Sequence, residues 1–91
     1  MCIDARNIES DTTLTSEVCI VGAGAAGITL ARRLAGTSTD VCLLESGGLE
    51  DPGEAQDLYR GENVGLPYLP LHGCRLRYFG GTTNHWAGWC S

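Results

Sequence analysis

Three glycines in the run GAGAAG, Gly22, Gly24 and Gly27, have the spacing that lets a backbone bind an anionic phosphate group. Glycine has no Cβ, so backbone N–H groups can come close to a ligand at these positions. A continuous apolar, β-prone run precedes the glycines at 18–21, and a helical pattern of apolar residues follows them. A phosphate at the start of that helix would satisfy its free N–H groups and complement the positive end of its dipole.

A carboxylate follows at the end of the next apolar run, 41–44, where Glu45 lies 18 residues after Gly27. Such a carboxylate accepts hydrogen bonds from a ribose diol and repels a 2′-phosphate. Strand, helix and strand within about 30 residues predict parallel strands joined by a right-handed crossover. The sequence therefore predicts an α/β fold with a Rossmann-like dinucleotide-binding βαβ unit. This unit alone leaves FAD and NAD as alternatives.

Composition excludes several classes of partner. The net charge is −5, with six arginines and no lysine, so binding of nucleic acid to a basic surface is not expected. No apolar run approaches the 18 residues of a membrane span, and the N-terminal residues lack a signal-peptide pattern, which favours a cytoplasmic location. The five cysteines form no C-x-x-C pair, which predicts free thiols in a reducing compartment.

The elements that must position these groups are predicted from turn and capping residues. Residues 2–5 could form a short edge strand, and Gly36 should close the first helix. A short helix is expected between the N-cap Asp51 and Gly61, with Pro52 as its first residue and Glu54 in a capping box. A proline-interrupted covering loop should follow at 62–73, and then an alternating stretch at 74–79.

The closing segment, RLRYFGGTTNHWAGWC at 75–90, holds a glycine pair, a polar run and both tryptophans. Together with VCIVGAGAAGITLARRL and VCLLESGG, it resembles the N-terminal part of the glucose–methanol–choline (GMC) family of FAD-dependent oxidoreductases. The resemblance runs from about Val18 to the end of the chain. It implies that residues 1–91 are the N-terminal portion of a larger, truncated FAD-binding domain, with the substrate domain absent.

The same resemblance implies roles for individual residues. The glycine pair would pass along the flavin's pyrophosphate and ring, Thr82, Thr83 and Asn84 would hydrogen-bond there, and Trp86 and Trp89 would be apolar walls. Arg75 and Arg77 would either neutralise phosphate charge or pair with the surplus carboxylates. The predicted cofactor-binding residues are Gly22, Gly24, Ala25, Ala26, Gly27, Glu45, Ser46, Arg75, Gly80, Gly81, Thr82, Asn84 and His85.

His85 leaves the attachment of the flavin open. In one branch of the family, that of pyranose oxidase, a Thr-His-Trp at this spacing carries the flavin covalently on the histidine. Here the run is Asn-His-Trp, so Asn84 departs from that pattern. The expectation is therefore non-covalent FAD, with a covalent link through His85 as the alternative.

The implied function is oxidation of CH–OH groups in sugars or other alcohols, by hydride transfer to flavin N5 with an open choice of electron acceptor. No catalytic residue is predicted in this chain, because the family's catalytic base lies in its C-terminal part, and residues 1–91 alone should be inactive. Two alternatives are a nicotinamide-dependent Rossmann dehydrogenase and a small non-enzymatic binding or zinc module. The zinc module would use His72, Cys74, His85 and Cys90, but their irregular spacing disfavours a metal site.

Overall fold

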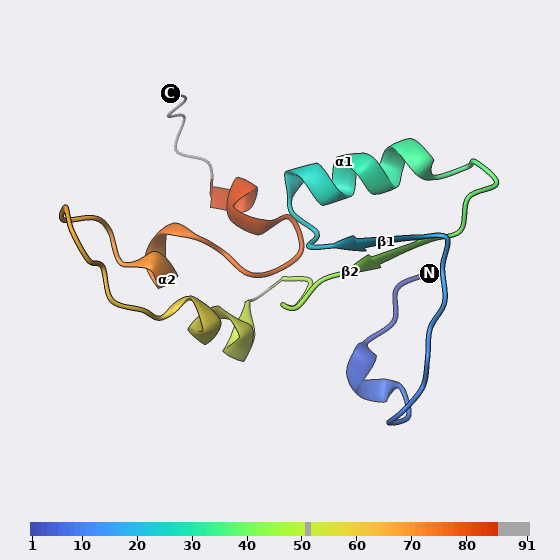
Figure 1. The fold of residues 1–91 in the computed structure, drawn as a ribbon, viewed down its shortest axis with the longest axis horizontal. Coiled ribbons are helices and arrows are strands. Elements are labelled where there is room, and N and C mark those ends of the chain that lie inside the picture. Colours follow the sequence, from blue (N-terminus) through green and yellow to red (C-terminus); the bar gives the residue numbers. More distant parts are fainter. Residues whose placement is uncertain (51, 86–91) are drawn as a thin grey trace.

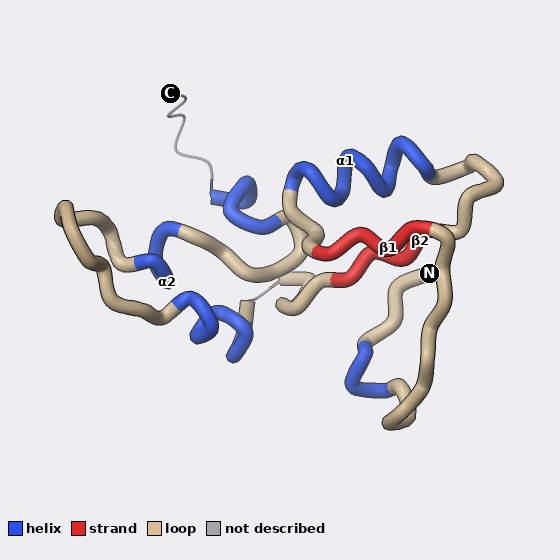
Figure 2. Tube along the Cα trace, in the orientation of Figure 1, coloured by secondary structure: helices blue, strands red, loops and turns tan. Residues whose placement is uncertain are grey.

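The computed structural model describes residues 1–50 and 52–85, and its centre is a strand–helix–strand unit (Figure 1). Strand β1 (Val18–Val21) pairs in parallel with β2 (Val41–Leu44), in a register that runs from Val18 opposite Val41 to Val21 opposite Leu44. Helix α1 (Ala25–Leu34) connects the two strands and lies along one face of the pair (Figure 2). The predicted α/β class and the parallel βαβ unit are confirmed.

Close packing of α1 on β1 depends on Gly27. A Cβ at this position would lie 1.9 Å from the carbonyl oxygen of Gly22 and 3.4 Å from Cγ2 of Ile20. Ile20 faces the helix and is buried, whereas Cys19 and Val21, on the opposite face of the strand, are exposed. Within the described residues, the strand pair is therefore covered on one face only.

The segment from residue 71 to residue 85, which we call the strap, returns to the carboxyl ends of the strands (Figure 1). It contains α2 (Leu71–Cys74) and the 3₁₀ helix η3 (Gly81–His85). The side chain of Gln56 ties it to the 3₁₀ helix η2 (Gly53–Tyr59), donating to the carbonyls of His72 and Arg75 and accepting from the N–H of Arg77.

The strap then passes directly over the residues that follow β2. A Cβ at Gly47 would lie 1.8 Å from the carbonyl oxygen of Arg77, and the N–H of Phe79 donates to the carbonyl of Gly48 over 3.0 Å. Glycine is therefore needed at position 47, because backbone crosses backbone there. Tyr78, in the same stretch, is one of only three buried apolar residues in the described chain, with Ile20 and Ala23.

Several predicted elements differ in the structure. Residues 2–5 form no edge strand; instead Asp4 caps the 3₁₀ helix η1 (Ala5–Asn7), accepting from the N–H and guanidinium of Arg6. The predicted helix between 51 and 61 is the 3₁₀ helix η2, with Pro52 as N-cap and Arg60 as C-cap. Asp51 lies outside the described residues.

Helix α1 closes at Gly36 as predicted, whereas the second half of the chain differs in detail. Helix α1 has Ala35 as its C-cap, and Gly36 follows with a positive φ of 82°. The predicted covering loop at 62–73 ends in α2. The two prolines that precede this helix favour a loop when the sequence is considered alone. The alternating stretch at 74–79 is extended at Arg75 but pairs with no strand; the carbonyl of Arg75 and the N–H of Arg77 bond to the side chain of Gln56 instead. None of the helices in the described residues has the length and hydropathy to cross a bilayer.

Such sparse burial leads to a prediction about residues 1–91 in isolation. Val21 is 83 % exposed and Leu44 46 % exposed on the bare face of the sheet, and parallel sheets are ordinarily covered on both faces. We expect the isolated polypeptide to show a broad thermal transition and poorly dispersed amide NMR signals, because too little apolar surface is buried to offset the chain entropy. A sharp, cooperative transition with dispersed amide signals would contradict this.

Candidate nucleotide-binding site

The glycine loop between β1 and α1 places unpaired N–H groups at the helix start. Gly22 leaves the strand with a φ of +99°, and its N–H donates to the carbonyl of Leu44 over 2.7 Å. Gly24 is the N-cap of α1 and no side chain caps the helix, as the sequence predicts. Within the described residues no acceptor bonds to the N–H groups of Ala25, Ala26 or Gly27. These donors can satisfy a phosphate at the positive end of the helix dipole.

Glu45 connects the end of β2 to the glycine loop. Its Oε2 accepts from the N–H of Ala23 over 2.7 Å, and its Oε1 accepts from the N–H groups of Ser46 and Gly47 over 2.8 and 3.0 Å. Burial raises the pKa of the carboxyl, but the hydrogen bonds from Gly47, Ala23 and Ser46 together outweigh burial and hold the pKa below its ordinary value. Glu45 is therefore ionised near neutral pH. Oε2 receives one bond in the described chain, which leaves acceptor capacity for a ribose hydroxyl.

The strap's glycine pair rests on the glycine loop. The N–H of Gly80 donates to the carbonyl of Ala23 over 2.7 Å, and a Cβ at Gly81 would lie 3.4 Å from Cα of Gly24. Both strap glycines have positive φ values, 90° and 59°, which non-glycine residues adopt rarely. Residues about 57 positions apart in the chain, Gly24 and Gly81, thus lie side by side at the start of α1.

A cleft of about 270 Å³ lies between these segments and combines charged, hydroxyl and glycine positions. Its walls come from the glycine loop, the end of β2, η2 and the strap: Gly22, Gly24, Glu45, Ser46, Tyr59, Leu76, Arg77, Tyr78, Gly81 and Thr82. Six residues of the predicted site, from three separate stretches of the sequence, are among them: Gly22, Gly24, Glu45, Ser46, Gly81 and Thr82. An anion-binding loop and a carboxylate in one cleft suit the pyrophosphate and ribose of a dinucleotide.

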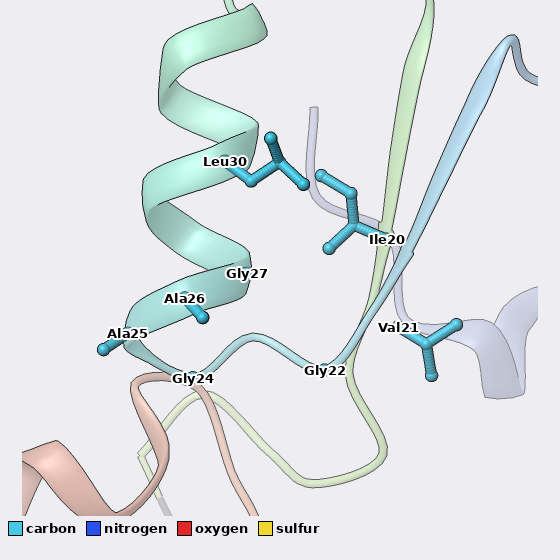
Figure 3. Close-up of a pocket in the computed structure, with 8 residues that line it drawn as sticks. All are labelled: Ile20, Val21, Gly22, Gly24, Ala25, Ala26, Gly27 and Leu30. Atoms are coloured by element: carbon cyan, nitrogen blue, oxygen red, sulfur yellow. The ribbon is translucent and has the colours of Figure 1, made fainter.

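A second, larger hollow of about 460 Å³ lies between α1 and β1 (Figure 3). Leu30 and Ile20 point toward each other across it, while Val21 points away from the helix (Figure 3). Its remaining lining residues are Gly22, Gly24, Ala25, Ala26 and Gly27. No lining side chain is polar, so this hollow lacks a side-chain partner for ribose or base. The nucleotide site is the smaller, polar cleft, and the glycine loop is shared by both hollows.

The two arginines of the strap have different surroundings. Arg77 lines the cleft, whereas Arg75, the arginine in the predicted set, is exposed and is not among the cleft residues. In a β-strand, residues 75 and 77 would lie on the same side. The strap pairs with no strand, so the alternation of a strand does not describe this stretch. The sequence analysis did not include Tyr59, Gln56 or Ala23 in the site, since nothing local indicates that η2 and the strap meet.

The polar residues after the glycine pair mainly stabilise the strap itself. Thr82 Oγ1 accepts from the N–H of Leu76 over 3.1 Å, and the hydroxyl of Thr83 donates to the carbonyl of Gly80. Asn84 Nδ2 donates to the carbonyl of Phe79 over 2.8 Å, and the side chain of His85 is exposed. Of these, Thr82 also lines the cleft. Trp86 and Trp89 lie outside the described residues.

The residues considered for zinc do not gather in the described chain. His72 and Cys74 lie on α2, and His85 ends η3. Within residues 1–50 and 52–85, no three His, Cys, Asp or Glu side chains are close enough to hold a metal ion. Cys90 lies outside the described residues.

Comparison with known proteins supports the nucleotide-binding interpretation of the first unit. A family model described as an NAD(P)-binding Rossmann-like domain matches residues 20–59, from within β1 to the end of η2. No curated protein and no solved structure matches the chain. The match indicates a Rossmann-like, dinucleotide-binding unit of the oxidoreductase type. It does not reach the strap, which carries the resemblance to the GMC family, and it does not distinguish FAD from NAD.

The surroundings of Gly24 predict a variant that loses the ligand and keeps the fold. A Cβ at Gly24 would meet no other atom within 4 Å, and the backbone there is extended, with φ −79° and ψ −174°. Gly24→Val should therefore leave the far-ultraviolet circular dichroism unchanged but weaken binding of ADP, measured by calorimetry, by about 100-fold or more, because the side chain occupies space that the pyrophosphate needs.

Gly27→Val is the matched comparison for that experiment. Its Cβ would lie 1.9 Å from the carbonyl oxygen of Gly22, so this variant should lose structure as well as binding. Undiminished ADP binding by Gly24→Val would show that the pyrophosphate does not pass over Gly24.

The bonds to Glu45 predict a pH dependence. The folded pKa of this carboxyl lies below its ordinary value of 4.5, so its bonds stabilise the loop above pH 4.5 and are lost as the pH falls through the folded pKa. In the full-length protein, the amide NMR signals of Ala23 and Gly47 should shift with pH, with a midpoint below 4.5. In the Glu45→Gln variant, the same signals should not change over this pH range. A midpoint at or above 4.5 would contradict the hydrogen bonding described here.

Proposed function

We propose that this chain forms the FAD-binding portion of an oxidoreductase that oxidises CH–OH groups of sugars or other alcohols. The observation that carries the proposal is the contact of Gly80 and Gly81 with the glycine loop beside the uncapped start of α1. A βαβ unit by itself serves FAD and NAD equally. A strap that returns over the pyrophosphate position is the added feature that the resemblance to the GMC family implies.

The residues around the cleft fit the ADP half of FAD. Glycine at 24 and 81 leaves both facing walls without side chains, which lets the backbone approach a pyrophosphate. The free N–H groups of α1 complement phosphate charge, while ionised Glu45 accepts from the ribose diol. These groups bind and orient the cofactor.

When bound, the flavin supplies the hydride-accepting chemistry, and the protein supplies orientation and electrostatics. We propose that the substrate site and the catalytic base belong to a further domain, as the resemblance to the GMC family implies. We also propose that the flavin is held without a covalent bond, since Asn84 replaces the threonine of the covalent pattern and its amide bonds to Phe79.

A nicotinamide-dependent dehydrogenase is the second candidate, because the family model that matches residues 20–59 is described as NAD(P)-binding. Ionised Glu45 at the ribose position would favour NAD over NADP, because a 2′-phosphate would be repelled. This candidate gives no role to the strap's glycine pair.

Spectroscopy of the purified full-length protein separates the two candidates. We expect visible flavin absorbance, release of FAD on acid denaturation, and bleaching of the flavin when an alcohol or sugar substrate is added without oxygen. Protein that carries no flavin, takes none up from added FAD and binds NAD instead would overturn the proposal. Flavin that stays with the denatured polypeptide would show a covalent link, which His85→Ala should abolish.

A further inference from the structure

Arg77 is held in an unusual setting for an arginine of an acidic chain. Its Nε donates to Ser46 Oγ over 2.8 Å, and its guanidinium carbon lies 5.1 Å from the centre of the Tyr59 ring. Arg77 and Tyr59 are both half-buried, and both line the polar cleft. A guanidinium at this distance from an aromatic ring makes a cation–π contact.

No carboxylate pairs with Arg77 in the part of the chain that the structure describes. The ion pairs found there are Arg6–Asp4 and Arg60–Asp57, although the whole chain carries a net charge of −5. The terminal amino groups of Arg77 donate to no acceptor among the same residues. The end of this side chain is therefore available to a ligand in the cleft.

The backbone that carries Arg77 is also held in place. Gln56 Oε1 accepts from the N–H of Arg77 over 3.0 Å, while Gln56 Nε2 donates to the carbonyls of His72 and Arg75, each over 2.6 Å. All polar atoms of this amide are thereby used on the strap. The guanidinium is thus positioned before any ligand arrives, which reduces the entropy lost on binding.

The order of residues along the cleft assigns Arg77 to one part of a dinucleotide. Gly24 and Gly81 meet where the pyrophosphate would lie, and Glu45 marks the ribose. Ser46 comes next, bonded on one side to Glu45 over 3.3 Å and on the other to Arg77. The group beyond the ribose in ADP is adenine, so Arg77 and Tyr59 lie where the base would be.

We propose that Arg77, supported from behind by Tyr59, is the platform on which the adenine of the dinucleotide stacks. A guanidinium is planar and stacks on aromatic faces, which a lysine ammonium cannot do. The proposal rests on the proposed function only in requiring a bound dinucleotide, since FAD and NAD share the ADP group. A role in neutralising phosphate charge is the competing interpretation, and it predicts rescue by lysine.

The test compares ligands with and without adenine, by calorimetry on the full-length protein freed of nucleotide. Arg77→Ala and Arg77→Lys should both weaken binding of ADP and FAD by about tenfold or more, since base stacking contributes about 1–3 kcal/mol. Neither should change binding of FMN, which lacks adenine. Tyr59→Leu should give a smaller loss and Tyr59→Phe none. The matched charge control is Arg33→Ala on the exposed end of α1, which should bind all ligands as the wild type does.

Each outcome has a distinct meaning. Full rescue by Arg77→Lys, an equal loss of FMN binding, or unchanged ADP binding by Arg77→Ala would overturn the adenine platform while leaving the FAD proposal in place. Wild-type protein that binds ADP and NAD but not FAD, with ADP binding still lost in Arg77→Ala, would overturn the FAD proposal and support the platform. Wild-type protein that binds no ADP at all would overturn both.

Discussion

The peptide groups of Ala23 connect the glycine loop, the end of β2 and the strap. Its N–H donates to the Glu45 carboxylate at the end of β2, and its carbonyl accepts from the N–H of Gly80 in the strap. Ala23 is 1 % exposed, so both bonds are shielded from water and an unpaired group here would be costly. Ala23 thus positions both the Glu45 carboxylate and the strap, and the polar cleft lies between these two.

Binding chemistry in this cleft comes mainly from backbone and only partly from side chains. Glycines line both facing walls, and the helix start presents N–H groups without a capping side chain. Three of the polar side chains that line it, Glu45, Ser46 and Arg77, form a hydrogen-bonded series. This division suits a ligand with an anionic centre and a polar end, because the backbone meets the phosphates and the side chains meet the sugar and base.

Few apolar side chains are buried in the described residues, so polar bonds have a large share in holding the cleft together. Three buried apolar residues in the described chain are few for a parallel sheet, and the face that carries Cys19 and Val21 has no cover among these residues. Stability of the cleft therefore depends on polar ties such as the amide of Gln56, which holds η2 and the strap together. Polar ties of this kind position a site well but contribute modestly to the free energy of folding.

Local sequence patterns by themselves determined the βαβ unit, the bounds of both strands, the glycine loop and the acid after β2. These features depend on hydrophobic periodicity and on the conformational freedom of glycine, which act over a few residues. Only the tertiary structure decided that Arg77, with Tyr59 and Gln56, belongs to the cleft, that the stretch at 74–79 forms no strand, and that Thr83 and Asn84 bond within the strap. The place of Arg77 and the path of the strap depend on contacts between residues about twenty to sixty positions apart, such as Ala23 with Gly80, and no local pattern encodes where such segments meet. The bonds of Thr83 and Asn84 are short in sequence, but they form because the strap turns back at its glycine pair.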